Sequence, residues 1–167
     1  TARREQTLDI ARLIDEYDRI IEGMKDTILR TARNHDAQAL ALLRSVPGIG
    51  KTLSLILLYE IHDITRFERV QDFCSYARLV KCAHESAGKR SGKSWRKIGN
   101  VHLKWAFSEA AVLFLRANSE GMKYKKRLER KHGKGKALSI LGHRMGRSVF
   151  FMLKRGKAFD MATFLAN

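Results

Sequence analysis

Apolar residues recur at alternating three- and four-residue intervals near the start of the chain. The series is Ile10, Leu13, Tyr17, Ile20, Met24 and Ile28, with charged residues between them. This spacing places one apolar stripe along a helix covering roughly residues 5–33. Such a helix would extend about 43 Å, which favours a coiled coil over a core helix of a small domain. We therefore expect residues 1–35 to form a coiled-coil or linker helix that self-associates as a dimer or higher oligomer. A helix packed on its own domain is the alternative.

The remaining sequence shows shorter helical patterns separated by turn residues. Asn34-His35-Asp36 interrupts the stripe, and Asp36 is suited to cap the next helix. A run of apolar residues at 53–59 would also suit a buried strand, but no nearby segment offers a partner. The predicted helices cover residues 37–45, 51–61, 67–79, 101–117, 122–132 and 137–155, with Asn100 as the cap of the fourth. The predicted fold class is all-α, with a compact helical domain at 36–160 and a tail at 161–167.

Charge is distributed unevenly along the chain. The sequence holds 33 Lys+Arg against 17 Asp+Glu, a net charge of +16, and basic and acidic residues balance over residues 1–80. Residues 81–167 hold 21 basic and five acidic residues, so the whole excess lies there. A field of this kind points to a polyanion, because Lys and Arg gain most by displacing counterions from phosphates. A basic solvated surface or an anionic membrane is the alternative.

Composition excludes several other classes of protein. Hydrophobic residues make up 44% of the 167 residues, enough for a core, and no apolar run is long enough to cross a bilayer. The polar N-terminus is not a secretory signal, and two cysteines cannot build a disulfide framework, so we expect a reducing cytosol. The chain does not begin with methionine, and we expect it to be a fragment or a processed chain.

The turn at 46–50 has the glycine spacing of a phosphate-contacting hairpin. A nucleotide-binding P-loop is disfavoured, because Ser45 stands where its first glycine belongs and the preceding segment favours a helix. A helix-hairpin-helix unit at 38–61 fits better, since its glycines let backbone amides approach a phosphate at the start of a helix. A tight turn without a ligand is the alternative. The nucleic-acid contacts expected here are Gly48, Ile49, Gly50 and Lys51.

Cys74, Cys82 and His84 invite a zinc interpretation that their spacing does not support. Seven residues and then one separate the three positions, and a fourth ligand is missing. We expect no metal site in this chain, with Cys74 filling the buried face of its helix.

Residues 81–98 lack a sustained apolar period and are predicted to form a cationic loop. Small residues in this loop would let a nucleic-acid strand approach the backbone, while its cations would bind the phosphates. Its hydroxyls, including Ser86 and Ser91, are phosphate hydrogen-bonders unless a base or a positive charge activates one as a nucleophile. The expected contacts are Gly88, Lys89, Arg90, Lys93, Arg96 and Lys97, followed by Asn100 and Lys104.

The order and spacing of several short motifs between about residues 40 and 149 carry a family resemblance. The motifs are Pro47-Gly-Ile-Gly50, Glu60-Ile61, Phe67, Tyr76-Ala77-x-Leu79-Val80, Ser86-x-Gly88-Lys89, Lys97-x-Gly99-Asn100, Leu103-Lys104 and Ala110-Ala111. Together they resemble the C-terminal transposase domain of the bridge-RNA-guided bacterial insertion-sequence recombinases. Proteins of that family pair a RuvC-like acidic domain with a serine-bearing helical domain.

The resemblance implies a catalytic serine at Ser86, which would attack a DNA phosphodiester and form a covalent phosphoserine intermediate. Ser91 is the rival position. The sequence departs from the family where Ala87 replaces a common glycine and Lys81 stands where proline is frequent.

The same resemblance implies partners and a second domain. DNA and a structured guide RNA would be the partners, in the nucleoid-associated cytoplasm of a bacterium. The acidic domain, which would hold Mg²⁺, should precede residue 1, so we expect this chain to be inactive alone and to contain no cofactor. The alternative function is a non-catalytic helix-hairpin-helix module that binds DNA or RNA.

Overall fold

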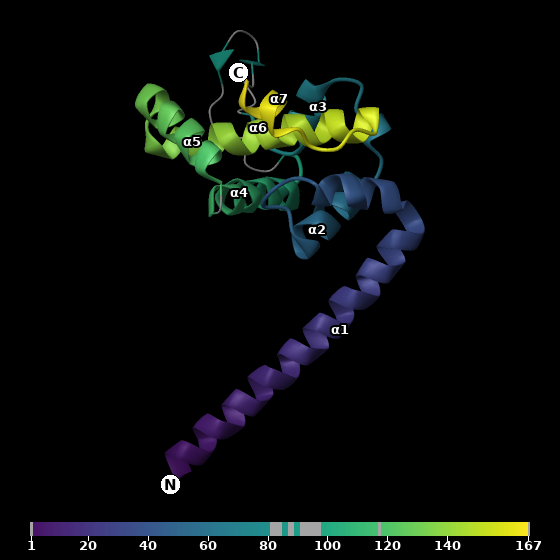
Figure 1. The fold of residues 1–167 in the computed structure, drawn as a ribbon, viewed down its shortest axis with the longest axis vertical. Coiled ribbons are helices and arrows are strands. Elements are labelled where there is room, and N and C mark those ends of the chain that lie inside the picture. Colours follow the sequence, from purple (N-terminus) through teal and green to yellow (C-terminus); the bar gives the residue numbers. More distant parts are fainter. Residues whose placement is uncertain (1, 81–84, 87–88, 91–97, 117, 167) are drawn as a thin grey trace. The chain divides into compact units, whose positions relative to one another are not determined.

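The protein is mainly helical, as a computed structural model shows (Figure 1). The structure describes the backbone of residues 2–80, 85–86, 89–90, 98–116 and 118–166. In chain order the elements are α1 (Ala2–Arg44), α2 (Lys51–Ile61), the 3₁₀ helix η1 (Ile64–Arg66), α3 (Val70–Tyr76), β1 (Glu85–Ser86), β2 (Lys89–Arg90), α4 (Val101–Arg116), α5 (Ser119–His132), α6 (Lys134–Arg155) and α7 (Met161–Leu165). The predicted all-α class is confirmed, and residues 53–59 lie in a helix rather than a strand. Among the described residues the only strands are the two-residue β1 and β2.

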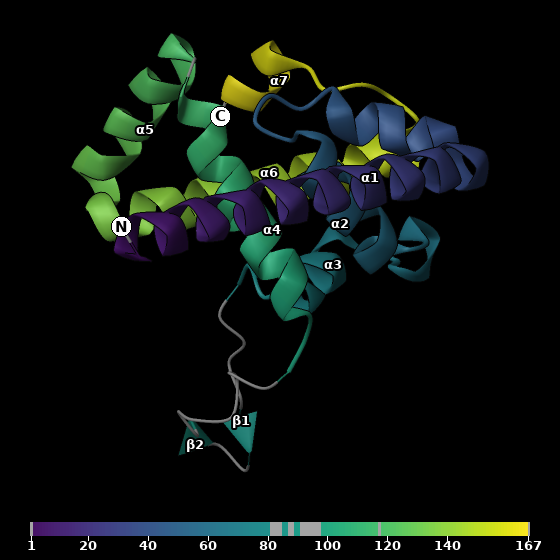
Figure 2. The same ribbon diagram turned by 90° about the horizontal axis from the view of Figure 1, so that it is seen from below.

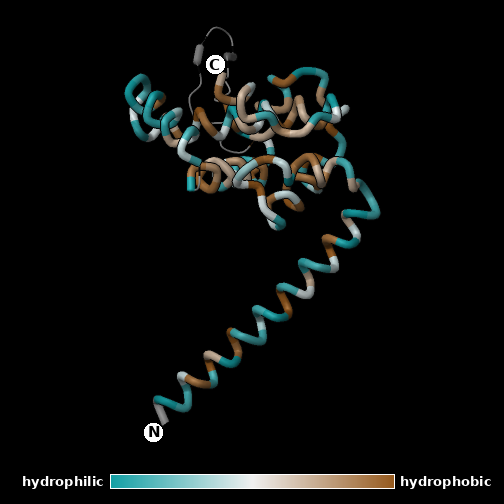
Figure 3. Tube along the Cα trace, viewed as in Figure 1, coloured by the Kyte–Doolittle hydropathy of each residue, from teal (hydrophilic) through white to brown (hydrophobic). Residues whose placement is uncertain are grey.

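Two compact units make up the chain, Thr1–Ala37 and Gln38–Asn167. The boundary coincides with the predicted helix break, because Asp36 in α1 has non-helical angles of φ −152° and ψ 80°. The first unit contains the predicted long helix, along which apolar positions recur (Figure 3). The six stripe residues from Ile10 to Ile28 are 43–64% exposed. Within the described residues, no helix combines the length and apolar content needed to span a membrane.

The second unit is organised around α4. Its buried face carries Phe107 and Phe114 among small residues, Ala106, Ala110 and Ala111. Each fully buried aromatic side chain of this kind contributes roughly 1.5–3 kcal/mol by leaving water. The small side chains let α2, α5 and α6 pack closely on α4, and the ring of Phe73 from α3 meets Phe107 edge-on, with centroids 6.1 Å apart. The alternation of large and small residues therefore fixes the helical layers drawn in Figure 1 and Figure 2.

Residues 161–165 of the predicted tail form the short helix α7. Asp160 begins α7 by accepting hydrogen bonds from the amides of Ala162 and Thr163 at 3.2 and 3.1 Å. Phe164 is buried, and its ring lies 5.2 Å from that of Phe114. The sequence predicts only a tail at 161–167, and the five residues of α7 are too few to show a helical period. Their anchor is a contact with a helix 50 residues earlier in the chain.

The turn between α1 and α2 contains a glycine that packing requires. Gly48 has φ +88°, and a Cβ there would lie 2.5 Å from the Phe114 nitrogen and 2.8 Å from the Ala110 oxygen. Gly50 adopts an ordinary extended conformation with open space around its Cα. The first glycine therefore lets the turn contact the backbone of α4, while the second has no such role.

Gly48→Ala should lower the free energy of unfolding by about 2–4 kcal/mol, because it combines a backbone clash with a left-handed φ. Gly50→Ala is the matched control and should change it by less than about 1 kcal/mol. Urea denaturation of both variants measures the difference. Equal losses of unfolding free energy would show that the turn does not contact the backbone of α4 closely.

Candidate nucleic-acid interface

The two ends of the predicted cationic loop are hydrogen-bonded to each other. The amide of Asn100 donates to the carbonyl of Tyr76 at 2.6 Å. The guanidinium of Arg78 donates through Nε to the carbonyl of Ile98 at 2.8 Å. Residues 24 and 20 positions apart are thereby held together, so the loop leaves and re-enters the helical unit at one place, between α3 and α4.

Gly99 permits this closure. Its φ is +90°, and a Cβ would lie 2.6 Å from the Tyr76 carbonyl oxygen. Any larger residue would push residues 98–100 away from the end of α3. The glycine of the Lys97-x-Gly99-Asn100 motif therefore has a structural reason, independent of any ligand.

The side chain of Asn100 joins three elements. Its oxygen accepts from the amide of Leu103 at 2.9 Å and so caps α4, as predicted. Its nitrogen donates to Glu60 Oε2 of α2 at 2.6 Å and lies 3.5 Å from the hydroxyl of Tyr76. Because both ends of the amide are engaged, Asn100 positions the loop base. Its predicted contact with nucleic acid stays a prediction.

Tyr76 completes the cluster at the loop base. Hydrogen bonds first from Asn100 and then from Arg66 lower the pKa of its phenol. The Arg66 guanidinium also stacks 4.6 Å from the centre of the Tyr76 ring. In the sequence, Glu60 and Tyr76 are marked only as parts of the family motifs. Glu60 lies 16 positions before Tyr76 and 40 before Asn100, and such distances produce no periodic pattern. Membership of those motifs is therefore what marks the two residues in the sequence.

Ser86 lies in a short antiparallel pair. The register places Ser86 opposite Lys89 and Glu85 opposite Arg90. The backbone around Ser86 is therefore extended. The register puts a lysine position beside the predicted nucleophile. This pair also corrects the prediction that residues 81–98 form a loop throughout.

Other predicted contacts occupy different settings. Lys51, Gly50 and Lys104 are exposed, whereas Ile49 is buried and its amide donates to the Val46 carbonyl at 3.0 Å. Gly48 faces α4, as described above. Ser91, Gly88, Lys93, Arg96 and Lys97 lie outside the described residues, and so do Cys82 and His84.

The described residues contain no group of three His, Cys, Asp or Glu side chains that could hold a metal ion. Cys74 is buried in α3, as expected, and burial raises the pKa of its thiol to about 11. A thiol with that pKa is protonated at neutral pH, so Cys74 is a packing residue.

Asn100→Ala should cost about 2–3 kcal/mol of unfolding free energy, because it removes both a helix cap and the bond to a carboxylate. Asn118→Ala is the matched control: Asn118 caps α5 through the Gly121 amide at 2.8 Å, away from the loop base. It should cost about 1 kcal/mol. Urea denaturation compares the two variants, and equal losses of unfolding free energy would show that Asn100 does not anchor the loop.

Comparison with known proteins assigns the chain to a family. The sequence pattern described as "Transposase IS116/IS110/IS902 family" matches residues 40–126, more than half of the chain. The match spans the loop base, Ser86, the whole of α4 and the first part of α5. It supports the predicted resemblance to a C-terminal transposase domain.

A curated relative agrees with this match. The "Insertion element IS110 uncharacterized 43.6 kDa protein" of Streptomyces coelicolor (strain ATCC BAA-471 / A3(2) / M145) is 28% identical over 123 residues. The aligned region covers 71% of this chain but only 30% of the relative's length. With the sequence pattern across its loop base and central helices, the chain belongs to the IS116/IS110/IS902 family of transposases.

Proposed function

We propose that this chain is the serine-bearing, DNA-cutting domain of an insertion-sequence recombinase, and that Ser86 is its nucleophile. The observation that carries the proposal is the family match over residues 40–126, which includes Ser86 and the anchored base of its loop. Support also comes from the β1–β2 register, which sets Lys89 opposite Ser86.

The proposed chemistry exchanges one phosphate ester for another. The Ser86 oxygen attacks a phosphodiester phosphorus, a bond from the serine oxygen to phosphorus forms, and the bond to one strand end breaks. The departing strand oxygen takes up a proton as the serine gives one up. A strand hydroxyl later attacks the phosphoserine and reverses these steps, so the energy of the ester bond is kept for rejoining.

Cations of the loop supply the electrostatic part of this proposal. Lys89 and Arg90, with Lys93, Arg96 and Lys97 beyond them in the sequence, would neutralise the charge that develops on the phosphate. Activation of Ser86 is assigned to Mg²⁺ chemistry in a preceding acidic domain, as the family resemblance implies. We therefore expect the isolated chain to bind nucleic acid, and to cut it only when the acidic domain is present.

Two nucleic acids are proposed as partners, the DNA substrate and a structured guide RNA. The charge of residues 81–167 supports polyanion binding in general. A purely binding helix-hairpin-helix module is the competing function. It predicts affinity for DNA without any covalent intermediate.

Ser86→Ala in the full-length protein, with its acidic domain and Mg²⁺, should abolish the covalent protein–DNA adduct trapped on a nicked or suicide substrate. DNA affinity should fall by no more than about fivefold, since one hydroxyl hydrogen bond contributes about 1 kcal/mol. Ser91→Ala is the matched control and should still form the adduct. Loss of the adduct in Ser91→Ala alone would move the nucleophile to Ser91, and no adduct in any version would favour the binding module.

The exposed stripe of α1 supports self-association as a second part of the proposal. A narrow apolar stripe flanked by charged residues is the pattern of a coiled-coil seam. The charged residues of α1 form ion pairs off the stripe, such as Lys25–Glu22 at 2.6 Å.

Leu13→Glu should shift the chain toward monomer in sedimentation equilibrium by placing a charge in the seam. Ala11→Glu adds the same charge off the stripe and should leave the association constant within about threefold. A monomeric unmodified chain, or equal effects of both variants, would contradict the coiled coil.

A further inference from the structure

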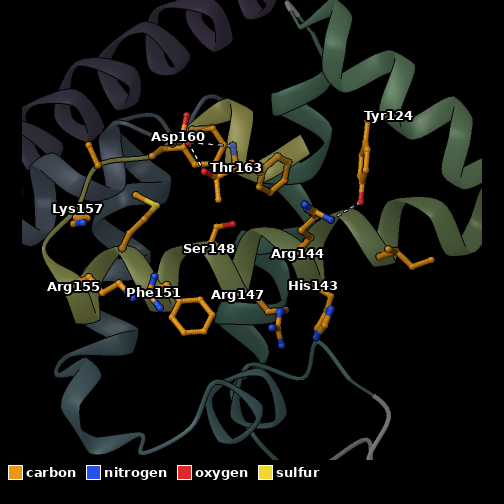
Figure 4. Close-up of a pocket in the computed structure, with 15 residues that line it drawn as sticks. Tyr124, His143, Arg144, Arg147, Ser148, Phe151, Arg155, Lys157, Asp160 and Thr163 are labelled. Carbon is orange, nitrogen blue, oxygen red and sulfur yellow. Dashed lines mark hydrogen bonds between the residues drawn. The ribbon is translucent and has the colours of Figure 1, made fainter. Parts of the chain in front are cut away.

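Except for Tyr124, the residues that line a pocket of about 700 Å³ lie outside the stretch that matches the transposase family. One face of α6 forms its floor, residues 157–160 and α7 form one wall, and Tyr124 of α5 closes one end (Figure 4). Pockets of several hundred Å³ accept small ligands or a single nucleotide unit. No sequence motif marks this region, because its lining comes from separate elements of the chain.

Positive charge predominates in the pocket. Arg147, Arg155 and Lys157 line it, and in the described part of the chain none of the three forms an ion pair. Arg144 donates a hydrogen bond to the Tyr124 hydroxyl at 3.0 Å, and this bond stabilises the wall of the pocket. Asp160 is the acidic lining residue, and its carboxylate is occupied in capping α7. The pocket therefore presents unneutralised cations to a ligand.

The histidine of the pocket adds no positive charge at neutral pH. Burial, and then the neighbouring Arg147, lower the pKa of His143. The positive charge of the site thus comes from its arginines and its lysine. An anion is the ligand that this arrangement favours.

Aromatic rings accompany the cations. Phe151 and Phe159 are half-buried and line the pocket, together with the buried Phe164, whose ring lies 5.2 Å from that of Phe159. The guanidinium of Arg155 stacks 4.8 Å from the centre of the Phe151 ring. A site for phosphate alone needs no ring, whereas sites for single strands combine cations for the backbone with aromatic faces for the bases.

We infer that this pocket binds an unpaired nucleotide of a single-stranded nucleic acid. Arg147, Arg155 and Lys157 contact its flanking phosphates, and its base packs against Phe151. A duplex is disfavoured because its bases stack on one another and cannot reach Phe151. The inference rests on the proposed function only in taking nucleic acid as the ligand of this chain, and it does not involve Ser86.

The test uses the whole 167-residue chain and fluorescein-labelled 15-mers of single-stranded RNA, single-stranded DNA and the matching DNA duplex. Phe151→Leu keeps an apolar side chain of similar size, so the fold should persist. It should weaken single-strand binding about tenfold, the effect of losing one base stack, and change duplex binding by less than twofold. A larger loss of affinity for the RNA than for the DNA 15-mer, or the reverse, identifies which of the two single strands the pocket binds.

The charge contribution is tested separately. Arg147→Gln with Arg155→Gln should lower the slope of log affinity against log salt by about 1.4 for single strands. Lys134→Gln with Lys136→Gln removes the same charge from exposed positions of α6 outside the pocket. This control should lower the slope by no more than half as much.

Photocrosslinking supplies a measurement that does not depend on any variant. A 15-mer with 5-iodouridine or 5-iododeoxyuridine should crosslink to a peptide within residues 143–164. Equal loss of duplex and single-strand affinity in Phe151→Leu, or crosslinks confined to other peptides, would overturn the pocket site. Because these are binding measurements, they stand whether or not Ser86→Ala abolishes the adduct.

Discussion

The close approach of neighbouring backbones to α4 is the constraint on which the second unit depends. Gly48 lets the turn before α2 meet the backbone at Ala110 and Phe114, where a Cβ would be only 2.5 Å from an amide nitrogen. Gly142 of α6 faces the carbonyl of Phe107, where an added Cβ would lie 3.4 Å from the oxygen, an ordinary van der Waals contact. With α4 fixed at these points, its N-terminus at Asn100 becomes a rigid support for the loop that carries Ser86.

Packing and chemistry are divided between different residues in this unit. Core side chains are apolar, and Ser54 is the buried polar residue among those described, with its hydroxyl bonded to the Lys51 carbonyl at 2.8 Å. Asn100, Glu60 and Tyr76 join the two parts, since they are half-buried and hydrogen-bond across three elements. Such a network holds the loop base in place.

The loop and the pocket suit different nucleic-acid chemistry. The loop combines small residues and cations with a serine, which fits a phosphodiester held for reaction. The pocket combines arginines with phenylalanine rings, which fits recognition of an unpaired base. The family match ends in α5, so the pocket's α6 and α7 lie beyond the stretch that identifies the family. A chain with both sites would hold a reacting strand and an unpaired strand on one helical unit.

Local pattern in the sequence determined the helices, the break at Asp36, the cap at Asn100 and the family, because each depends on residues a few positions apart. The excess of positive charge after residue 80 is likewise a property of composition. Only the tertiary structure decided that Gly48 serves packing, that Glu60 and Tyr76 hold Asn100, and that Arg147, Arg155 and Phe151 share a pocket with Lys157. Those relations join residues distant in the chain, and a hydrogen bond or a cavity between distant segments leaves no period in the sequence.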